Sequence, residues 1–250
     1  MPARQGLRPL KAWRYVGVYG PELMLCVATV RIGPARQSFW ALWDREAGRL
    51  HEHTLLGRGD VSLEPGGARV AGAKVRIELR LDENQGIETI SPTGASYAWT
   101  RKQGGVAARG TVEIDGVARR IDSRAVIDDS AGYHERHTRW RWSAGVGRAD
   151  DGRALAWNLV DGVHDSPLAS ERTIWIEGRS REVGPCWFDP DLSGVDALRF
   201  TAEAARERSD NLLLVRSRYR QPFGTFSGEL PGGVRVAEGY GVMEEHDAWW

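Results

Sequence analysis

Residues 128–142, DDSAGYHERHTRWRW, gather carboxylates, histidines and tryptophans within one short stretch. Adjacent aspartates ahead of small residues most often accept hydrogen bonds from backbone N–H groups in a turn. In a desolvated cavity mouth beside Trp140, by contrast, Asp128 or Asp129 would have a raised pKa and could act as an acid near neutral pH. The residue types therefore leave two alternatives, a turn and an acid catalyst.

His134 and His137 are spaced as HxxH. This spacing brings two imidazoles together on a helix and puts them on opposite faces of a strand. The surrounding residues are typical of turn and strand. A zinc site also needs three or four converging ligands, and the other histidines offer no local spacing for them. The pattern predicts no metal site and leaves His137 as a candidate catalytic group beside the strand that follows.

A second concentration of titratable groups lies at the C-terminus, GYGVMEEHDAWW. In a strand, Glu244 and His246 share one face, where residues two apart are close enough to form an acid–base pair. A surface contact at a chain end is the alternative. Because exposing both Trp249 and Trp250 would be costly, we expect this terminus to pack on the body of the protein.

Glu171 lies just before the apolar run TIWIEG. In a strand it shares a face with Thr173 and Trp175. Its carboxylate fits either burial near an aromatic wall or a solvated place on an edge strand. The sequence favours the solvated place, because glutamate is rarely buried unless it is paired.

Strict alternation over residues 138–147 predicts the strand that positions the first cluster. Trp140 and Trp142 lie on one face and arginines on the other. The segment ALAWNLVDG predicts a neighbouring strand with Trp157 and Asn158 on opposite faces. A buried Asn158 needs partners for its amide, so it is either a satisfied structural group or a ligand contact. The predicted ligand-binding residues are Tyr133, Trp140, Trp142, Trp157, Asn158 and Trp175.

Short runs with period-two alternation recur along the whole chain, separated by Gly, Pro and Asp. This pattern is typical of an antiparallel meander. Asp115-Gly116 and Asp151-Gly152 favour the positive φ angles of tight hairpins, so each predicts that its flanking runs pair. Residues 201–211, TAEAARERSDN, have a helix-favouring composition, but apolar alternation through this segment predicts a strand. The expected fold is all-β with little helix.

The chain has 250 residues, with 34 basic and 34 acidic side chains. This balance gives no electrostatic footprint for nucleic acid or an anionic membrane. Cys26 and Cys186 lie in apolar runs without a CxxC pattern, which predicts free buried thiols. We expect a soluble, cytoplasmic protein, because the N-terminus lacks a signal-peptide core and no run approaches the ~18 apolar residues of a membrane span. No GxSxG elbow, phosphate loop or dinucleotide fingerprint occurs.

Three groups of segments together resemble the DUF2804 family of bacterial and fungal proteins: LRPLKAWRYVGVYGPELMLCVATVRIG, then DDSAGYHERHTRWRWSAGVG with AWNLVDG and SERTIWIEG, and finally FGTFSGEL with GYGVMEEHDAWW. Longer members carry N-terminal sequence that this chain is expected to lack. The family is similar in architecture to lipocalin-like double-β-domain proteins, which include the carotenoid hydratase hydroxyneurosporene synthase and AttH-like proteins. The resemblance implies an antiparallel meander forming two barrel-like or sandwich-like halves, residues 1–130 and 131–250, a cavity for an apolar ligand, and no required cofactor.

Two classes of function fit this description. An enzyme would protonate an apolar, isoprenoid or polyketide-like substrate as a hydratase, isomerase or cyclase, with tryptophan faces stabilising positive charge. A carrier would hold a hydrophobic ligand in the same cavity without reaction. Carbohydrate binding or hydrolysis is a more distant hypothesis. The enzyme hypothesis requires a carboxyl of raised pKa inside the cavity, and the candidate catalytic residues are Asp128, Asp129, Glu171, Glu244, His137 and His246.

Overall fold

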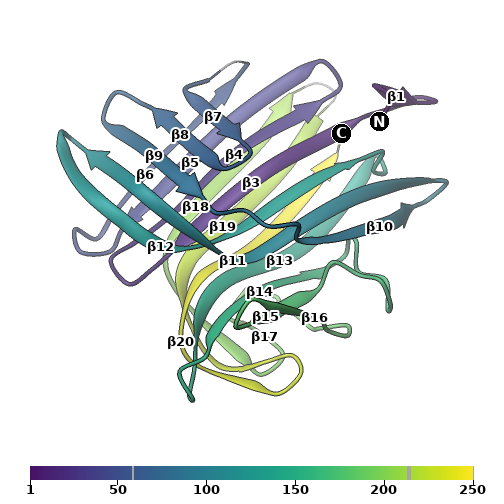
Figure 1. Cartoon of the computed structure of the whole chain (residues 1–250). Coiled ribbons are helices and arrows are strands. Elements are labelled where there is room, and N and C mark those ends of the chain that lie inside the picture. Colours follow the sequence, from purple (N-terminus) through teal and green to yellow (C-terminus); the bar gives the residue numbers. More distant parts are fainter. Residues whose placement is uncertain (58, 213–214, 250) are drawn as a thin grey trace.

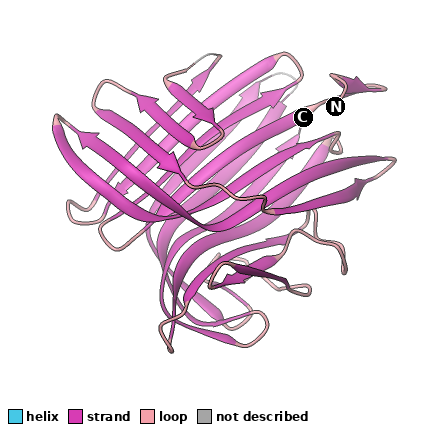
Figure 2. Cartoon of the chain, in the orientation of Figure 1, coloured by secondary structure: helices cyan, strands magenta, loops and turns pink. Residues whose placement is uncertain are grey.

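The computed structural model describes residues 1–57, 59–212 and 215–249, and these fold into strands and loops (Figure 1, Figure 2). No helix occurs among the described residues, and hence none that could cross a membrane. The predicted all-β fold is confirmed. Within the described ranges the strands form a ten-stranded antiparallel sheet, an eight-stranded antiparallel sheet and a short pair, β1 (Arg4–Gln5) with β2 (Arg8–Pro9).

The first sheet takes its strands from the N-terminal part of the chain. The order across it is β6-β5-β4-β3-β12-β11-β9-β8-β7, and β10 pairs with β11 beside this path. Its strands are β3 (Lys11–Tyr19), β4 (Leu23–Ile32), β5 (Ala35–Asp44), β6 (Arg49–Leu56), β7 (Val61–Glu64), β8 (Gly67–Ala71), β9 (Val75–Leu81), β10 (Ile87–Thr93), β11 (Ser96–Ile114) and β12 (Val117–Gly132).

The second sheet follows in the order β16-β15-β14-β13-β20-β19-β18-β17. Its strands are β13 (His137–Ala149), β14 (Ala154–Asp161), β15 (Thr173–Ile176), β16 (Arg179–Glu182), β17 (Gly194–Val195), β18 (Leu198–Leu212), β19 (Val215–Leu230) and β20 (Val234–Trp249). β18 confirms the strand predicted over 201–211. The chain changes sheet between Gly132 and His137, just beyond the predicted boundary at residue 130, and the division into two domain halves stays a prediction.

Turn residues set the pairing of neighbouring strands. Asp115 (φ 48°) and Gly116 (φ 86°) both adopt positive φ at the tip of the β11–β12 hairpin, as predicted. At the second predicted hairpin, β13 pairs with β14, but of the Asp151-Gly152 dipeptide Gly152 alone has positive φ (83°), because the connection is longer than two residues. Both dipeptides correctly identify paired neighbours.

Buried apolar side chains form three clusters. One packs on the concave side of the first sheet, around Val16 and Leu42. Another belongs to the second sheet, around Trp157 and Phe226. The third takes residues from both sheets, including Tyr15 and Trp142, and holds the two sheets together. Both cysteines are free and buried, as predicted.

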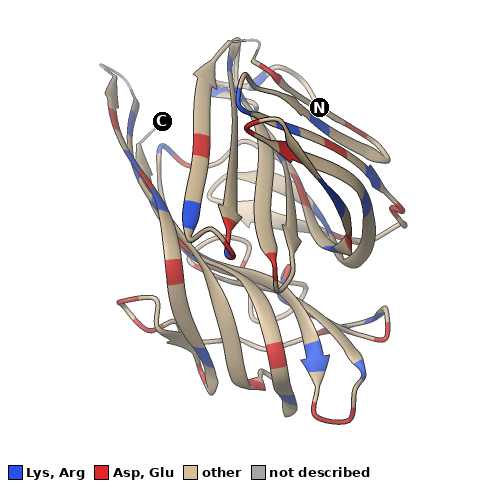
Figure 3. Cartoon of the chain, turned by 90° about the vertical axis from the view of Figure 1, so that its left-hand side faces the viewer, with Lys and Arg blue, Asp and Glu red and all other residues tan. Residues whose placement is uncertain are grey.

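The C-terminal strand lies in the middle of the second sheet. β20 is hydrogen-bonded on one side to β13 and on the other to β19, which confirms that the terminus docks on the body of the protein. Trp249 nevertheless stays 45% exposed and stacks on His137 with ring centroids 4.2 Å apart, while Trp250 lies outside the described residues. Basic and acidic residues are interspersed along the strands of both sheets (Figure 3).

Candidate functional site

A cavity of about 150 Å³ lies where the two sheets face each other. Its wall is largely aromatic, and its aromatic residues are Trp13, Tyr15, Phe39, Trp140, Trp142 and Tyr219. Titratable side chains reach the same space from both sheets and from the loop after β14, and they include Lys102, Asp128, His134, His164, Glu171, Glu244 and His246. An apolar enclosure with a few convergent polar groups is typical of a small-molecule site.

Glu244 projects from β20 into this cavity. Its Oε1 accepts a hydrogen bond from Trp140 Nε1 at 2.9 Å, and its Oε2 accepts one from Gln221 Nε2 at 2.8 Å. Burial raises the pKa of Glu244 to about 7, because these hydrogen bonds to the ionised form only partly offset the loss of hydration. The carboxyl is therefore partly protonated at neutral pH, as an acid catalyst requires.

This raised pKa predicts a measurable effect on stability. An unfolded Glu244 titrates near 4.5 and the folded residue near 7, so the folded state binds more protons between these values and loses stability as the pH rises. Over this range wild type should lose about 3 kcal/mol that a Glu244→Gln variant retains. Urea unfolding at pH 5 and pH 8 measures this difference, with Glu245→Gln on the opposite face as the control. An equal pH dependence in Glu244→Gln and wild type would contradict the assignment.

Lys102, on β11, bridges two buried carboxyls. Its Nζ lies 2.6 Å from Asp128 Oδ1 and 3.2 Å from Glu171 Oε1. Burial raises the pKa of Asp128 to about 6 despite the nearby ammonium, and it also raises the pKa of Glu171. Burial alone would lower the pKa of Lys102, but the two carboxylates together outweigh it and raise that pKa. One cation thus serves two acids, and Asp128 titrates just below neutral pH.

Two buried histidines lie at the same end of the cavity. His134 Nε2 and His164 Nε2 are 3.2 Å apart, so one ring donates and the other accepts. His134 also packs on Trp13 with ring centroids 5.1 Å apart. Burial lowers the pKa of each histidine to about 3, with the partner ring adding to the effect at His134 and Lys102 adding to it at His164. Both rings are therefore neutral at physiological pH and offer polarity without charge.

The comparisons with known proteins bear on this architecture. The model of the family described as "Domain of unknown function (DUF2804)" matches residues 58–250. The chain belongs to DUF2804. A search of curated protein sequences gives no match.

Two solved structures share the fold of this DUF2804 chain. A protein assigned to AttH from Nitrosomonas europaea is 14% identical, with a TM-score of 0.56 over 97% of this chain and 94% of that one. Kievitone hydratase from Nectria haematococca is 10% identical, with a TM-score of 0.54 over 94% of this chain and 88% of that one. At these identities the likeness shows the fold, and it confirms the lipocalin-like double-β architecture that the resemblance to DUF2804 implied.

Several predicted residues of the DUF2804 chain meet in the cavity. Asp128, Glu171, Glu244 and His246 all line it. His246 Nε2 lies 2.7 Å from Ser217 Oγ, and burial lowers the pKa of His246 to about 3, so this imidazole is neutral. The alternation argument correctly placed Glu244 and His246 on one face.

Two earlier interpretations are wrong. Asp128 and Asp129 do not cap a turn, because β12 continues through both to Gly132 and each side chain pairs with a cation on a neighbouring strand. Glu171 is not a solvated edge residue, because it is 3% exposed and paired with Lys102.

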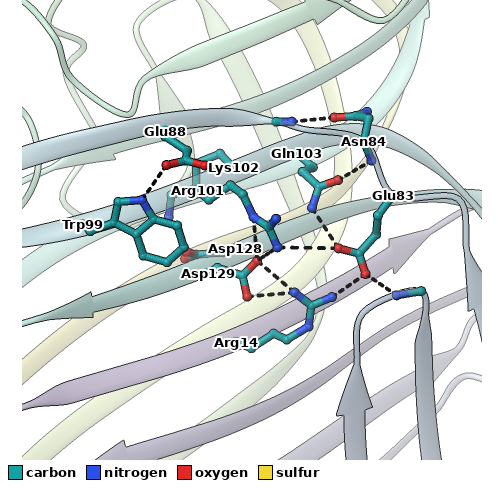
Figure 4. Close-up of polar contacts among 12 residues, drawn as sticks. Arg14, Glu83, Asn84, Glu88, Trp99, Arg101, Lys102, Gln103, Asp128 and Asp129 are labelled. Carbon is teal, nitrogen blue, oxygen red and sulfur yellow. Dashed lines mark hydrogen bonds and ion pairs between the residues drawn. The ribbon is translucent and has the colours of Figure 1, made fainter. Parts of the chain in front are cut away.

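Two predicted catalytic residues lie outside the cavity. Asp129 points to the other side of β12, where it pairs with Arg14 and Arg101 (Figure 4). His137 is exposed at the start of β13, and its Nε2 lies 2.9 Å from Asp247 Oδ1. Neither side chain shares the enclosure with Glu244.

The predicted ligand-binding residues also divide. Trp140 and Trp142 line the cavity. Asn158 lies behind Trp142, accepting from its Nε1 at 2.8 Å and donating to the Glu171 carbonyl at 2.9 Å, so it positions both. The remaining three pack elsewhere: Tyr133 donates to the Pro2 carbonyl, Trp157 lies in the core of the second sheet, and Trp175 covers Gly104.

Sequence reasoning missed several cavity residues, above all Lys102 and His164. Lys102 lies in SYAWTRK, one of the short alternating runs along the chain, and the sequence does not assign this lysine to a strand face. It is one of only three lysines in the chain, and that scarcity was the available signal. His164 comes from the loop between β14 and β15, whose path the sequence does not specify. Within the described residues, no three His, Cys, Asp or Glu side chains converge to hold a metal ion.

Proposed function

We propose that this protein is a cofactor-independent acid catalyst of the hydratase, isomerase or cyclase class, acting on an apolar small molecule. The observation that supports the proposal is the Glu244 carboxyl, which is buried in an aromatic cavity with a pKa raised to about 7. Kievitone hydratase shares the fold, so this architecture also carries a hydratase. We favour hydration of an alkene as the reaction.

Glu244 and Asp128 fit the two proton-transfer roles. Protonated Glu244 donates a proton to the alkene, whose π electrons form the new C–H bond and leave a carbocation facing Trp140 and Trp142. Water adds its lone pair to the carbocation, and ionised Asp128 removes the surplus proton from the resulting oxonium group. Solvent exchange then reprotonates Glu244 and deprotonates Asp128. The net reaction adds one water to one alkene.

The size of the cavity limits the substrate. Its volume is about 150 Å³, similar to that of a dry apolar cavity that takes up benzene, so the group enclosed beside Glu244 has about the size of one ring or one short isoprenoid chain. A trisubstituted alkene on such a chain gives a tertiary carbocation, which forms most readily. A prenylated phenol carries a short isoprenoid chain with a trisubstituted alkene, so it is a suitable first probe.

The proposal is tested by incubating the purified protein with a prenylated phenol and following the mass of the products. A product heavier by one water, or an isomer of the probe, supports it, as does the same conversion of any compound extracted from the purified protein. If prenylated phenols and extracted compounds bind, shown by a change in tryptophan fluorescence, but are recovered unchanged, the carrier hypothesis replaces the enzyme.

The two titrating groups also predict a pH profile. The acid must be protonated and the base ionised, so kcat/KM should be bell-shaped, with limbs near the pKa values of Asp128, about 6, and Glu244, about 7. Trp140→Phe removes a hydrogen bond that stabilises ionised Glu244, so it should move the alkaline limb to higher pH and leave the acidic limb in place. A shift of the acidic limb instead would reverse the assignments of acid and base.

A further inference from the structure

A second pocket, of about 640 Å³, lies on the concave side of the first sheet. Strand β12 separates this pocket from the central cavity, since Asp128 faces the central cavity and the next residue, Asp129, lines the second pocket. Trp13, on the neighbouring strand β3, contributes atoms to both walls. The second pocket plays no part in the chemistry proposed above.

The floor of this pocket is a row of polar side chains on four paired strands, Asp129, Arg14, Thr29 and Ser38, and Arg101 continues this row on β11 beside the pocket. Its charges largely satisfy one another (Figure 4). Arg14 Nη1 lies 2.8 Å from Asp129 Oδ1, and Arg14 Nη2 lies 2.5 Å from Glu83 Oε1. Arg101 Nη2 also reaches Asp129 Oδ2 at 2.7 Å. The arginines of this row are already neutralised by carboxylates, so the row offers a ligand little positive charge.

The adjacent row on the same face has a different character. It runs across β11, β12, β3, β4 and β5 and consists of Trp99, Ala131, Ala12, Arg31 and Arg36. All five residues line the pocket. The two alanines leave open space between an indole at one end and a pair of guanidinium groups at the other. From the strand of Trp99 to the strand of Arg31 the distance is about 14 Å, three inter-strand spacings.

The guanidinium pair brings two like charges together. Arg31 and Arg36 are directly opposite each other in the β4–β5 register, where like charges destabilise a sheet. Among the described residues, neither forms an ion pair with an acidic side chain, whereas Arg14 and Arg101 do. Ser38 lies two residues from Arg36 on the same strand face. It is 4% exposed, and its hydroxyl has no hydrogen-bond partner in the described part of the chain.

We propose that this pocket binds a small organic anion, with its carboxylate or other anionic group between Arg31 and Arg36 and its flat apolar body lying over Ala12 and Ala131 toward Trp99. The anion neutralises two facing cations and can accept a hydrogen bond from the Ser38 hydroxyl. Arginine suits this role because its planar group binds carboxylates in a bidentate manner. The site is independent of the Glu244 cavity.

Isothermal titration with biphenyl-4-carboxylate tests the proposal, because this probe combines an aromatic body of suitable length with one carboxylate. Biphenyl-4-carboxamide is the neutral match, and inorganic phosphate is the anion without a body. We expect the carboxylate to bind at least tenfold more tightly than the other two. The double variant Arg31→Gln/Arg36→Gln should abolish that preference, and Ala12→Leu, which fills the middle of the row, should weaken carboxylate binding at least tenfold.

Two control variants make the result decisive. Arg76→Gln/Arg80→Gln removes the same charge from exposed positions of β9 and should bind the carboxylate as wild type does. Glu244→Gln alters the central cavity and should likewise leave binding unchanged. Equal affinity for the carboxylate and the carboxamide, binding of phosphate as tight as that of the carboxylate, or loss of binding in Glu244→Gln but not in Arg31→Gln/Arg36→Gln would each overturn the proposal.

Discussion

Replacing Glu244 with Gln should lower turnover of a prenylated phenol, or of any other substrate identified, by about 10²- to 10⁴-fold, the contribution typical of a general acid. The amide has nearly the same shape and can still accept the hydrogen bond from Trp140 Nε1, but it has no proton to donate at neutral pH. Substrate affinity should therefore change little while kcat falls. Single-turnover kinetics with product detection by mass would separate these two effects.

Glu245→Gln is a matched control for this experiment. Glu245 is the next residue of β20, faces away from the cavity and pairs with Arg139 and Arg141 at the surface. This variant should keep nearly all activity. Urea unfolding of Glu244→Gln at the assay pH shows directly whether unfolding contributes to its loss of activity. Retained activity in Glu244→Gln, with loss in Asp128→Asn, would place the acid at Asp128 instead.

The second large effect concerns stability. Lys102→Met should destabilise the fold by about 3–5 kcal/mol, because it leaves Asp128 and Glu171 buried without their shared cation. The loss should be larger at pH 8 than at pH 5. Below the pKa of Asp128, about 6, that carboxyl is neutral and depends less on the lysine, so the penalty shrinks as the pH falls. Urea unfolding at the two pH values measures both the penalty and its pH dependence.

Lys74→Met is the corresponding surface change. Lys74 is exposed in the loop before β9, so Lys74→Met should change the free energy of unfolding of the protein by no more than about 0.5 kcal/mol. The bridging role assigned to Lys102 is ruled out if Lys102→Met costs no more than Lys74→Met, or if its cost is the same at both pH values.

Alternation in the sequence was enough to predict the fold and the part of the cavity wall that β13 and β20 supply. Trp140, Trp142, Glu244 and His246 were assigned to their strand faces because β13 and β20 keep a strict period of two where they meet the cavity. The same argument gives no information on which strands lie opposite one another. The residues that contact Glu244 and Asp128 therefore could not be predicted from the sequence.

Lys102 illustrates a different limit. A β-bulge at Gly105, with φ 73°, interrupts the pairing of β11 with β12 between Gly104 and Val106. The extra residue reverses which side chains face which side of β11. Strict alternation from the buried Val106 and Ala108 would therefore place Lys102 in the core of the first sheet, whereas it lines the central cavity. Glu171 can be buried because it pairs with this lysine. Since the sequence did not place Lys102 in the cavity, it favoured a solvated position for Glu171.

The opposite orientations of Asp128 and Asp129 have a consequence for how this chain can change length. β12 is the common wall of the two compartments, and a one-residue slip in its pairing would exchange the acid of the central cavity for the acid of the arginine-lined pocket. A single insertion or deletion within β12 would thus change the lining of both compartments at once. We expect natural variants and engineered insertions to be tolerated at the Asp115-Gly116 hairpin tip, where added residues leave the register of the wall unchanged.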